Sequence, residues 1–129
     1  MLKKGWDSME AREMAEKAAR ILYDRKADQI LVLDVSKLTV IADYMVIASG
    51  RNILQTKALA DDLDDMMAQE GIPLRAREGK DEGKWIVLDY NSVLIHIFQP
   101  EARQYYHLER LWSDGSNRLD LPFLNETAD

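Results

Sequence analysis

The chain has 129 residues, of which 47% are apolar and 31% charged, with a net charge of −6 and no cysteine. This length favours one domain, the composition excludes a largely disordered chain, and the lack of cysteine excludes disulfides and cysteine zinc sites. The acidic balance argues against direct binding of nucleic-acid phosphates, which usually requires a basic face. We therefore expect a basic or neutral protein surface as the partner.

The sequence also bears on where the protein works. No apolar run approaches the ~20 residues needed to cross a bilayer. The first residues, Met-Leu-Lys-Lys-Gly-Trp, lack the apolar core of a signal peptide, and the acidic residues that follow argue against a transit peptide. We therefore expect a cytoplasmic protein with no membrane partner.

The first part of the chain combines a helical pattern with two strand patterns. Asp7 is the predicted cap of a first helix, Glu10 completes a capping box, and an apolar stripe at helical spacing runs to residues 24–26. Apolar runs of strand length follow at residues 29–34 and 42–48. The first run has no polar alternation, so we expect both of its faces to be covered.

A second helix is predicted after residue 50. Asn52 and Gln55 form a capping box, four apolar residues at helical spacing set a buried stripe, and Gly71 ends the helix. Residues 74–78 then form a weaker strand that carries two arginines. Charged residues are common on edge strands, so this strand is placed near an edge of the sheet.

Residues 85–98 form the centre of the predicted sheet. Their β-branched and aromatic content predicts two strands joined by a tight turn at residues 91–92. Trp85, Val87 and Asp89 share one face of the first strand, because side chains alternate along a strand. Both faces of this hairpin are largely apolar. Helices of the chain must cover one face, and a helix or a partner molecule the other.

The last predicted helix begins at Pro100 and ends near residue 113, with Tyr105 and Trp112 on its apolar stripe. The residues from 116 to 129 lack periodicity and are predicted to form a loosely ordered tail, which leaves one domain at residues 1–115. The order of elements predicts an α/β (α+β) fold. In this fold a mixed, mainly five-stranded sheet has helices packed chiefly on one face.

Enzyme chemistry finds little support in the sequence. A strand that ends in Ser49-Gly50 before a helix can present backbone N–H groups to a phosphate, as in nucleotidyltransferases. Those enzymes also need clustered carboxylates on a nearby strand to hold two Mg²⁺ ions. The next strand carries Arg75 and Arg77 instead. A metal-dependent, nucleotidyltransferase-like enzyme therefore stays only as an alternative function.

Other types of site lack the required spacing. His96 and His107 are the only histidines and fall in a strand and a helix without a local ligand pattern, so no metal site or cofactor is predicted. A nucleophile elbow for a serine triad is missing. Asp89 stands beside a turn, where an aspartate more often orders its own backbone than performs acid–base chemistry.

Aromatic residues with polar tips gather in the C-terminal third: Trp85, Tyr90, Tyr105, Tyr106 and Trp112. Such residues are common anchors of protein interfaces, because they bury a large area at low entropic cost. Tyr105 and Trp112 also fit the core of the last helix, and we favour that interpretation for both. Trp85 follows a glycine-containing junction, so we predict that it is half exposed and contacts a partner.

Several short motifs occur together between Leu31 and Trp112. The main ones are Ala42-Asp-Tyr-Met-Val-Ile-Ala-Ser-Gly50, Trp85-Ile-Val-Leu-Asp-Tyr90, Val93-Leu-Ile-His-Ile-Phe98 and Leu111-Trp112. In this order and spacing they resemble the ribosomal silencing factors, also called Iojap-like proteins. The first helix matches that family in type only, and the tail beyond Ser113 lies outside the shared pattern.

This resemblance implies a fold and a function. The fold would be related in topology to the nucleotidyltransferases but would lack their catalytic acids. Family members bind the large ribosomal subunit through the ribosomal protein called L-fourteen, and they sterically block joining of the small subunit. This represses translation when nutrients are scarce. Free members are often homodimers, and neither a cofactor nor sequence-specific nucleic-acid binding is implied. A dimeric adaptor with another protein partner is a further alternative.

The predicted partner surface combines the aromatic pattern with this resemblance. An acidic protein that meets a basic ribosomal protein gains electrostatic complementarity, and a central aromatic such as Trp85 would supply the buried anchor. The candidate partner-binding residues are Asp43, Tyr44, Trp85, Asp89, Tyr90, His96, Tyr106 and Glu109. Tyr44, His96 and Tyr106 could instead be packed internally. No catalytic, cofactor-binding or metal-binding residue is predicted.

Overall fold

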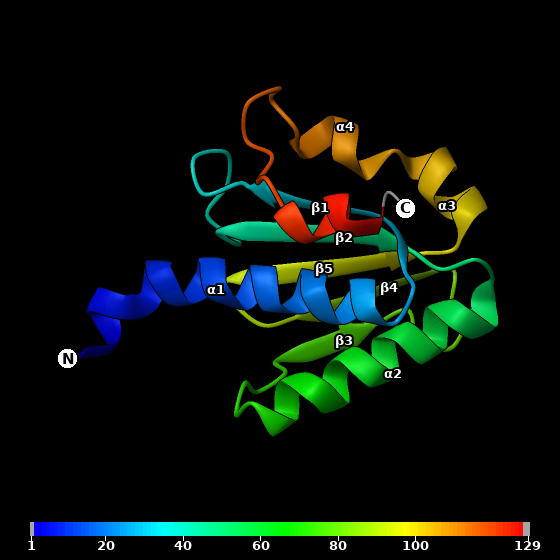
Figure 1. Cartoon of the computed structure of the whole chain (residues 1–129), viewed down its shortest axis with the longest axis horizontal. Coiled ribbons are helices and arrows are strands. Elements are labelled where there is room, and N and C mark those ends of the chain that lie inside the picture. The colour runs from blue at the N-terminus through cyan, green and yellow to red at the C-terminus, as the bar shows by residue number, and fades with distance from the viewer. Residues whose placement is uncertain (1, 128–129) are drawn as a thin grey trace.

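The computed structural model describes the backbone of residues 2–127 and the side chains of residues 11–124. In chain order the elements are α1 (Leu2–Asp24), β1 (Asp28–Asp34), β2 (Tyr44–Ser49), α2 (Ile53–Gln69), β3 (Ala76–Glu78), β4 (Trp85–Asp89), β5 (Val93–Phe98), α3 (Pro100–Tyr106), α4 (Leu108–Trp112) and the 3₁₀ helix η1 (Pro122–Thr127) (Figure 1). Within this described part of the chain, no helix is long and apolar enough to cross a membrane.

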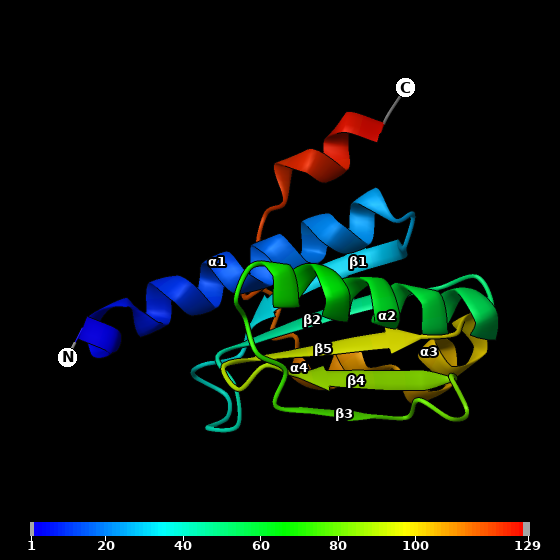
Figure 2. The same ribbon diagram turned by 90° about the horizontal axis from the view of Figure 1, so that it is seen from below.

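The strands form one five-stranded sheet in the order β1-β2-β5-β4-β3. β2 and β5 are parallel, and the other neighbouring pairs are antiparallel. The predicted mixed sheet is therefore confirmed, and β3, which contains Arg77, lies at its edge as expected. Figure 2 shows α1 and α2 together on one side of this sheet.

The main core lies between the sheet and these two helices. Small residues of α1, among them Ala15 and Ala18, are fully buried and allow the helix axis to approach the strands closely. α2 adds Leu63 and Met67, which are also fully buried. The strand residues of this face are apolar as well, as the sequence pattern requires for a covered face.

A second, smaller core lies on the opposite face of the sheet. Leu33, Met45, Ile47 and Phe98 are buried there, and Ala102 of α3 packs against them. Leu108 and Trp112 of α4 contact the same cluster from its margin. Helices α3 and α4 therefore cover part of this face, while most of the helical cover lies on the other side.

Local signals explain how α2 and the hairpin begin and end. The Asn52 side chain accepts a hydrogen bond from the Gln55 N–H at 2.8 Å, and the Gln55 side chain accepts one from the Arg51 N–H at 2.6 Å. These bonds satisfy donors at the start of α2, which confirms the predicted cap. In the hairpin the Tyr90 N–H donates to the Val93 carbonyl at 2.9 Å, so the predicted tight turn is also confirmed.

Two predicted helix boundaries are wrong. α1 begins at Leu2, so Asp7 lies inside this helix, and the side chains of the predicted capping pair lie outside the described residues. The last helix is broken at His107, whose backbone is left-handed at φ 50° and ψ 48°. The break turns α4 away from the axis of α3 (Figure 1). The single apolar stripe predicted across both segments therefore does not form.

The predicted loose tail is also wrong for residues 117–124. The Asp34 N–H donates to the Asn117 carbonyl at 2.8 Å, and the Leu119 N–H donates to the Val32 carbonyl at 2.9 Å. These bonds satisfy backbone groups along the outer edge of β1, which would otherwise be an open sheet edge. Leu121 is buried, and the Phe123 ring lies 5.2 Å from the Tyr23 ring on α1.

Candidate functional site

The alternation along β4 and β5 places aromatic residues on the face opposite α1 and α2. The register pairs Trp85 with Phe98 and Val87 with His96. Cross-strand partners lie side by side on one face of a sheet, so these residues form a continuous surface. Tyr106 of α3 joins them, and we call the set of Trp85, His96, Phe98 and Tyr106 the aromatic face.

Trp85 lies at the centre of the aromatic face. Its ring is 4.9 Å from the Phe98 ring in a stacked arrangement and 4.8 Å from the Tyr106 ring in a tilted one. Trp85 is only half-buried, and Tyr106 is 53% exposed. The predicted exposure of Trp85 therefore agrees with the structure. Such pairs of rings contribute about 1 kcal/mol beyond the area they bury, so this exposed tryptophan is held in place.

Further exposed apolar side chains lie on the two short helices, α3 and α4. Tyr105 is 82% exposed and meets Tyr106 edge-on at 4.9 Å, and Leu111 of α4 is 72% exposed. The prediction that Tyr105 belongs to the core is wrong, because the break at His107 interrupts the stripe on which it was placed. Trp112 does contact the second core, as predicted. Tyr105 and Leu111 are the surface residues that the helical periodicity missed.

His96 lies beneath this surface rather than on it. It is 7% exposed, and its Nδ1 atom accepts a hydrogen bond from the Trp85 Nε1–H at 3.0 Å. Burial lowers the pKa of His96 to about 4, because the charged imidazolium would lose its hydration. His96 is therefore a neutral residue at pH 7 that touches the predicted anchor.

Two of the predicted acidic residues, Asp43 and Asp89, lie beside the hairpin turn at residues 91–92. Asp89 is partly buried and pairs with Arg75 at 3.6 Å, and it also accepts a hydrogen bond from the Asn91 N–H at 2.7 Å. Asp89 thus orders the hairpin turn while lying on the same side of β4 as Trp85. Asp43 directly precedes β2, and its N–H donates to the Ser92 carbonyl at 2.8 Å.

Two predicted tyrosines lie on the other side of the sheet. Tyr90 is 3% exposed and packs in the main core, where burial raises the pKa of its hydroxyl. Tyr44 is partly buried against the same core, and burial together with nearby Asp34 raises its pKa. The structure therefore does not bring Tyr44 and Tyr90 together with Trp85.

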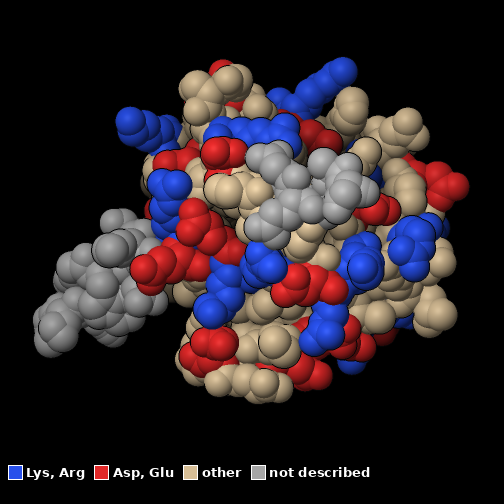
Figure 3. Space-filling model, in the orientation of Figure 1, with Lys and Arg blue, Asp and Glu red and all other residues tan. Residues whose placement is uncertain are grey.

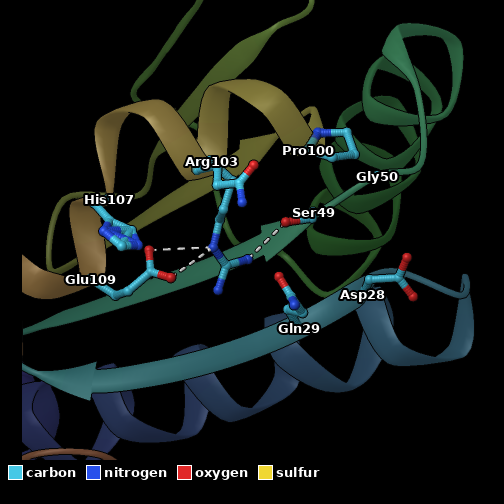
Figure 4. A pocket seen from close by; sticks show the side chains of 9 residues that line it. Asp28, Gln29, Ser49, Gly50, Pro100, Arg103, His107 and Glu109 are labelled. Carbon is cyan, nitrogen blue, oxygen red and sulfur yellow. Dashed lines mark hydrogen bonds and ion pairs between the residues drawn. The ribbon is translucent and has the colours of Figure 1, made fainter.

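Glu109 belongs to a separate polar cluster beside the Ser49-Gly50 turn (Figure 4). It pairs with the Nε atom of Arg103 at 3.1 Å, and Arg103 donates a second hydrogen bond to the Ser49 hydroxyl at 2.8 Å. Arg103 is 6% exposed. These side chains line a cavity of about 710 Å³ that also includes His107.

This polar cluster bears on the alternative enzyme function. The guanidinium of Arg103 lies beside the Ser49-Gly50 turn, 2.8 Å from the Ser49 hydroxyl, and its positive charge would repel a divalent cation there. Among the described side chains, no group of three or more histidines or carboxylates is placed to hold a metal ion. The geometry instead fits a buried ion pair that ties β2 to α3 and α4.

Charges of both signs lie on each side of the molecule. Lys and Arg side chains are interspersed with Asp and Glu over the side formed by α1 and α2, and neither sign predominates in this view (Figure 3). Arg77 of β3, for example, pairs with Asp61 of α2 at 2.7 Å. On the opposite side a cleft of about 610 Å³ lies between Trp85, Tyr106 and the loop at residues 79–84, which brings both lysines and acids to its rim.

Comparisons with known proteins agree on one family. Residues 8–129 match the model of the family described as "Ribosomal silencing factor during starvation". A ribosomal silencing factor of Bacillus subtilis is 35% identical over 107 residues, which covers 83% of this chain and 91% of that protein. A mouse protein named "Mitochondrial assembly of ribosomal large subunit protein 1" is 33% identical over 96 residues, or 72% of this chain and 42% of that protein.

A solved structure supports the same assignment. The crystal structure of a Chromobacterium violaceum protein superimposes with a TM-score of 0.76 and 32% sequence identity, and the match covers 85% of this chain and 93% of that chain. The family model spans almost the whole sequence, and the Bacillus subtilis relative exceeds 30% identity over most of its length. This chain therefore belongs to the ribosomal silencing factor family.

Proposed function

We propose that this protein is a non-enzymatic repressor of translation. It binds the large ribosomal subunit through the ribosomal protein L-fourteen, on the face that meets the small subunit, and sterically blocks subunit joining. The single observation that carries this proposal is the aromatic face, found here in a member of the ribosomal silencing factor family. On this face the half-buried Trp85 stacks on Phe98 and lines the cleft beside the loop at residues 79–84.

The chemistry of the aromatic face supports a protein partner. Trp85, Tyr105, Tyr106 and Leu111 offer exposed or half-exposed apolar area that a partner can remove from water. The charged rim of the cleft provides groups that can pair with a partner at the margin of the contact. The net charge of −6 favours encounter with a basic ribosomal protein, mainly by raising the association rate.

The geometry sorts the predicted residues for this role. Trp85, Asp89 and Tyr106 lie on the side of the sheet that we assign to the partner, and His96 lies directly beneath Trp85. Tyr44 and Tyr90 lie on the helix-covered side, so we assign them to the core. Glu109 is held by Arg103 and contributes through the position of α4.

Co-sedimentation with isolated bacterial large ribosomal subunits tests the proposal. The wild-type protein should sediment with large subunits, and Trp85→Glu should lose this binding because it places a charge in the buried centre of the contact. Loss of an anchor worth about 2 kcal/mol corresponds to a roughly 30-fold weaker Kd. Leu54→Glu is the matched control, since Leu54 is 79% exposed on α2, on the other side of the sheet.

The blocking step needs its own measurement. Wild-type protein added to equal amounts of large and small subunits should lower the fraction of joined ribosomes in a sucrose gradient, and Trp85→Glu should not. Full binding by a folded Trp85→Glu variant would remove Trp85 from the site. Normal joining of subunits that carry the wild-type protein would refute the steric block.

A second copy of the chain is the competing occupant of the same face. We propose that the free protein is a homodimer that uses this apolar surface, since an exposed surface of this kind favours association. Size-exclusion chromatography with and without purified L-fourteen tests this. A dimer that persists unchanged in the complex would contradict the shared surface.

A further inference from the structure

The hydrogen bond between Trp85 and His96 fixes the proton on the histidine ring. An indole Nε1–H can only donate, so the Nδ1 atom of His96, 3.0 Å away, must be unprotonated. The single proton of the neutral ring is then on Nε2. Nε2 is buried and has no hydrogen-bond partner among the described protein atoms.

This arrangement is unfavourable for His96 taken alone. A buried donor without a partner costs free energy, and the cross-strand neighbours of His96 are the apolar residues Ile47 and Val87. An apolar side chain of similar size would fill the space without this cost. What the histidine adds at this position is therefore its acceptor for Trp85.

Trp85 needs such a partner because stacking alone does not fix its orientation. The Phe98 and Tyr106 rings contact the indole at 4.9 and 4.8 Å, but ring stacking has no partner for the indole N–H and so does not specify the direction in which Nε1 points. The hydrogen bond to His96 specifies this direction. The hydrogen bond therefore selects which edge of Trp85 is presented outward.

We propose that His96 is a positioning residue, which locks Trp85 in one orientation before the partner binds and does not itself contact the partner. This inference rests on the proposed function, since its consequence is measured as affinity for the large ribosomal subunit. Preorganisation of an anchor raises affinity, because the side chain is already ordered and loses less conformational entropy on binding.

A double-mutant cycle separates this role from a general structural one. His96→Phe keeps an aromatic ring but removes the acceptor, and it should weaken the Kd for isolated large subunits about three- to tenfold, the effect of one hydrogen bond. In a Trp85→Phe background, which has no indole N–H, the same His96→Phe change should have no further effect. His96→Gln restores an acceptor and should recover part of the affinity.

Equal weakening in both backgrounds would show that His96 only supports the fold, and no weakening in the wild-type background would refute the positioning role. If wild-type protein does not bind large subunits, the proposed function fails, and the free protein still tests the hydrogen bond. Nitrogen-15 NMR should then show the proton on Nε2 of His96. It should also show slow exchange of the Trp85 indole proton, faster in His96→Phe or, should that variant not fold, in His96→Leu, which also lacks an acceptor. A proton on Nδ1 would overturn the inference.

Discussion

Gly79 supports the start of β4, and replacing it with alanine should destabilise the protein more than the same change at Gly115. Both glycines have left-handed backbones, with φ of +83° and +89°. A Cβ atom at Gly115 would have no atom within 4 Å, whereas a Cβ atom at Gly79 would lie 1.9 Å from the carbonyl oxygen of Trp85. Comparison of the two alanine variants therefore separates the cost of the left-handed backbone from the cost of steric overlap.

The magnitudes follow from these two terms. A left-handed alanine costs about 1–2 kcal/mol, and the loss of glycine's freedom in the unfolded chain offsets part of this, so Gly115→Ala should cost about 1 kcal/mol. Gly79→Ala has the same conformational cost, and it must also move the Trp85 carbonyl oxygen from 1.9 Å to beyond the 3.0 Å that Cβ contacts require. Comparable overpacking adds about 1–3 kcal/mol, which gives a total of about 2–4 kcal/mol.

Urea unfolding of the three proteins measures the difference in free energy of unfolding. Because the displaced carbonyl belongs to Trp85, Gly79→Ala should also weaken co-sedimentation with large subunits, while Gly115→Ala should not. Equal losses of stability in the two variants would refute the argument, since the close approach of Gly79 to Trp85 would then have no energetic effect.

Three further predictions concern buried or strained groups. Arg103→Met should cost about 2–3 kcal/mol of stability in urea because Glu109, 28% exposed, loses its partner, whereas Arg12→Met removes an exposed pair and should change stability by less than about 1 kcal/mol. His107→Gly should raise stability by about 1 kcal/mol by relieving the left-handed backbone at φ 50°, and His107→Ala should give no such gain. The folded-state pKa of His96, about 4, is below its unfolded value of 6.5, so the unfolded state binds the proton first as pH falls. Stability should be full above pH 6.5 and decrease between pH 6.5 and 4, by about 2 kcal/mol at pH 5, and the urea midpoint of His96→Phe should vary less across this window.

The strands and α2 could be predicted because their signals are local. Strand periodicity and apolar content located β1, β2, β4 and β5 to within about two residues, and Asn52 with Gln55 marked the start of α2. The edge position of β3 also followed from Arg75, which precedes it, and Arg77, which lies in it. Each of these features depends on neighbouring residues, so no knowledge of distant contacts was needed.

The break at His107 and the packing of the tail depend on distant contacts instead. Arg103 and Glu109 are six residues apart, a spacing that does not bring side chains together on a continuous helix, and they meet because the chain turns at His107. The tail binds the edge of β1 through Asn117 and Leu119, whose partners lie more than 80 residues earlier. Periodicity within the last 30 residues contains no sign of either contact.

The candidate site shows why a sequence motif is not a surface. The segment Trp85-Ile-Val-Leu-Asp-Tyr90 is contiguous in the chain, but side chains alternate along β4, so Trp85 and Asp89 lie on one side of the sheet and Ile86 and Leu88 on the other. Tyr90 continues this alternation into the main core, where it is 3% exposed. A motif in a strand that is covered on both faces therefore mixes residues for binding with residues for packing. The side of the sheet on which a side chain lies distinguishes binding residues from packing residues. For this reason Trp85 belongs to the proposed interface and Tyr90 does not.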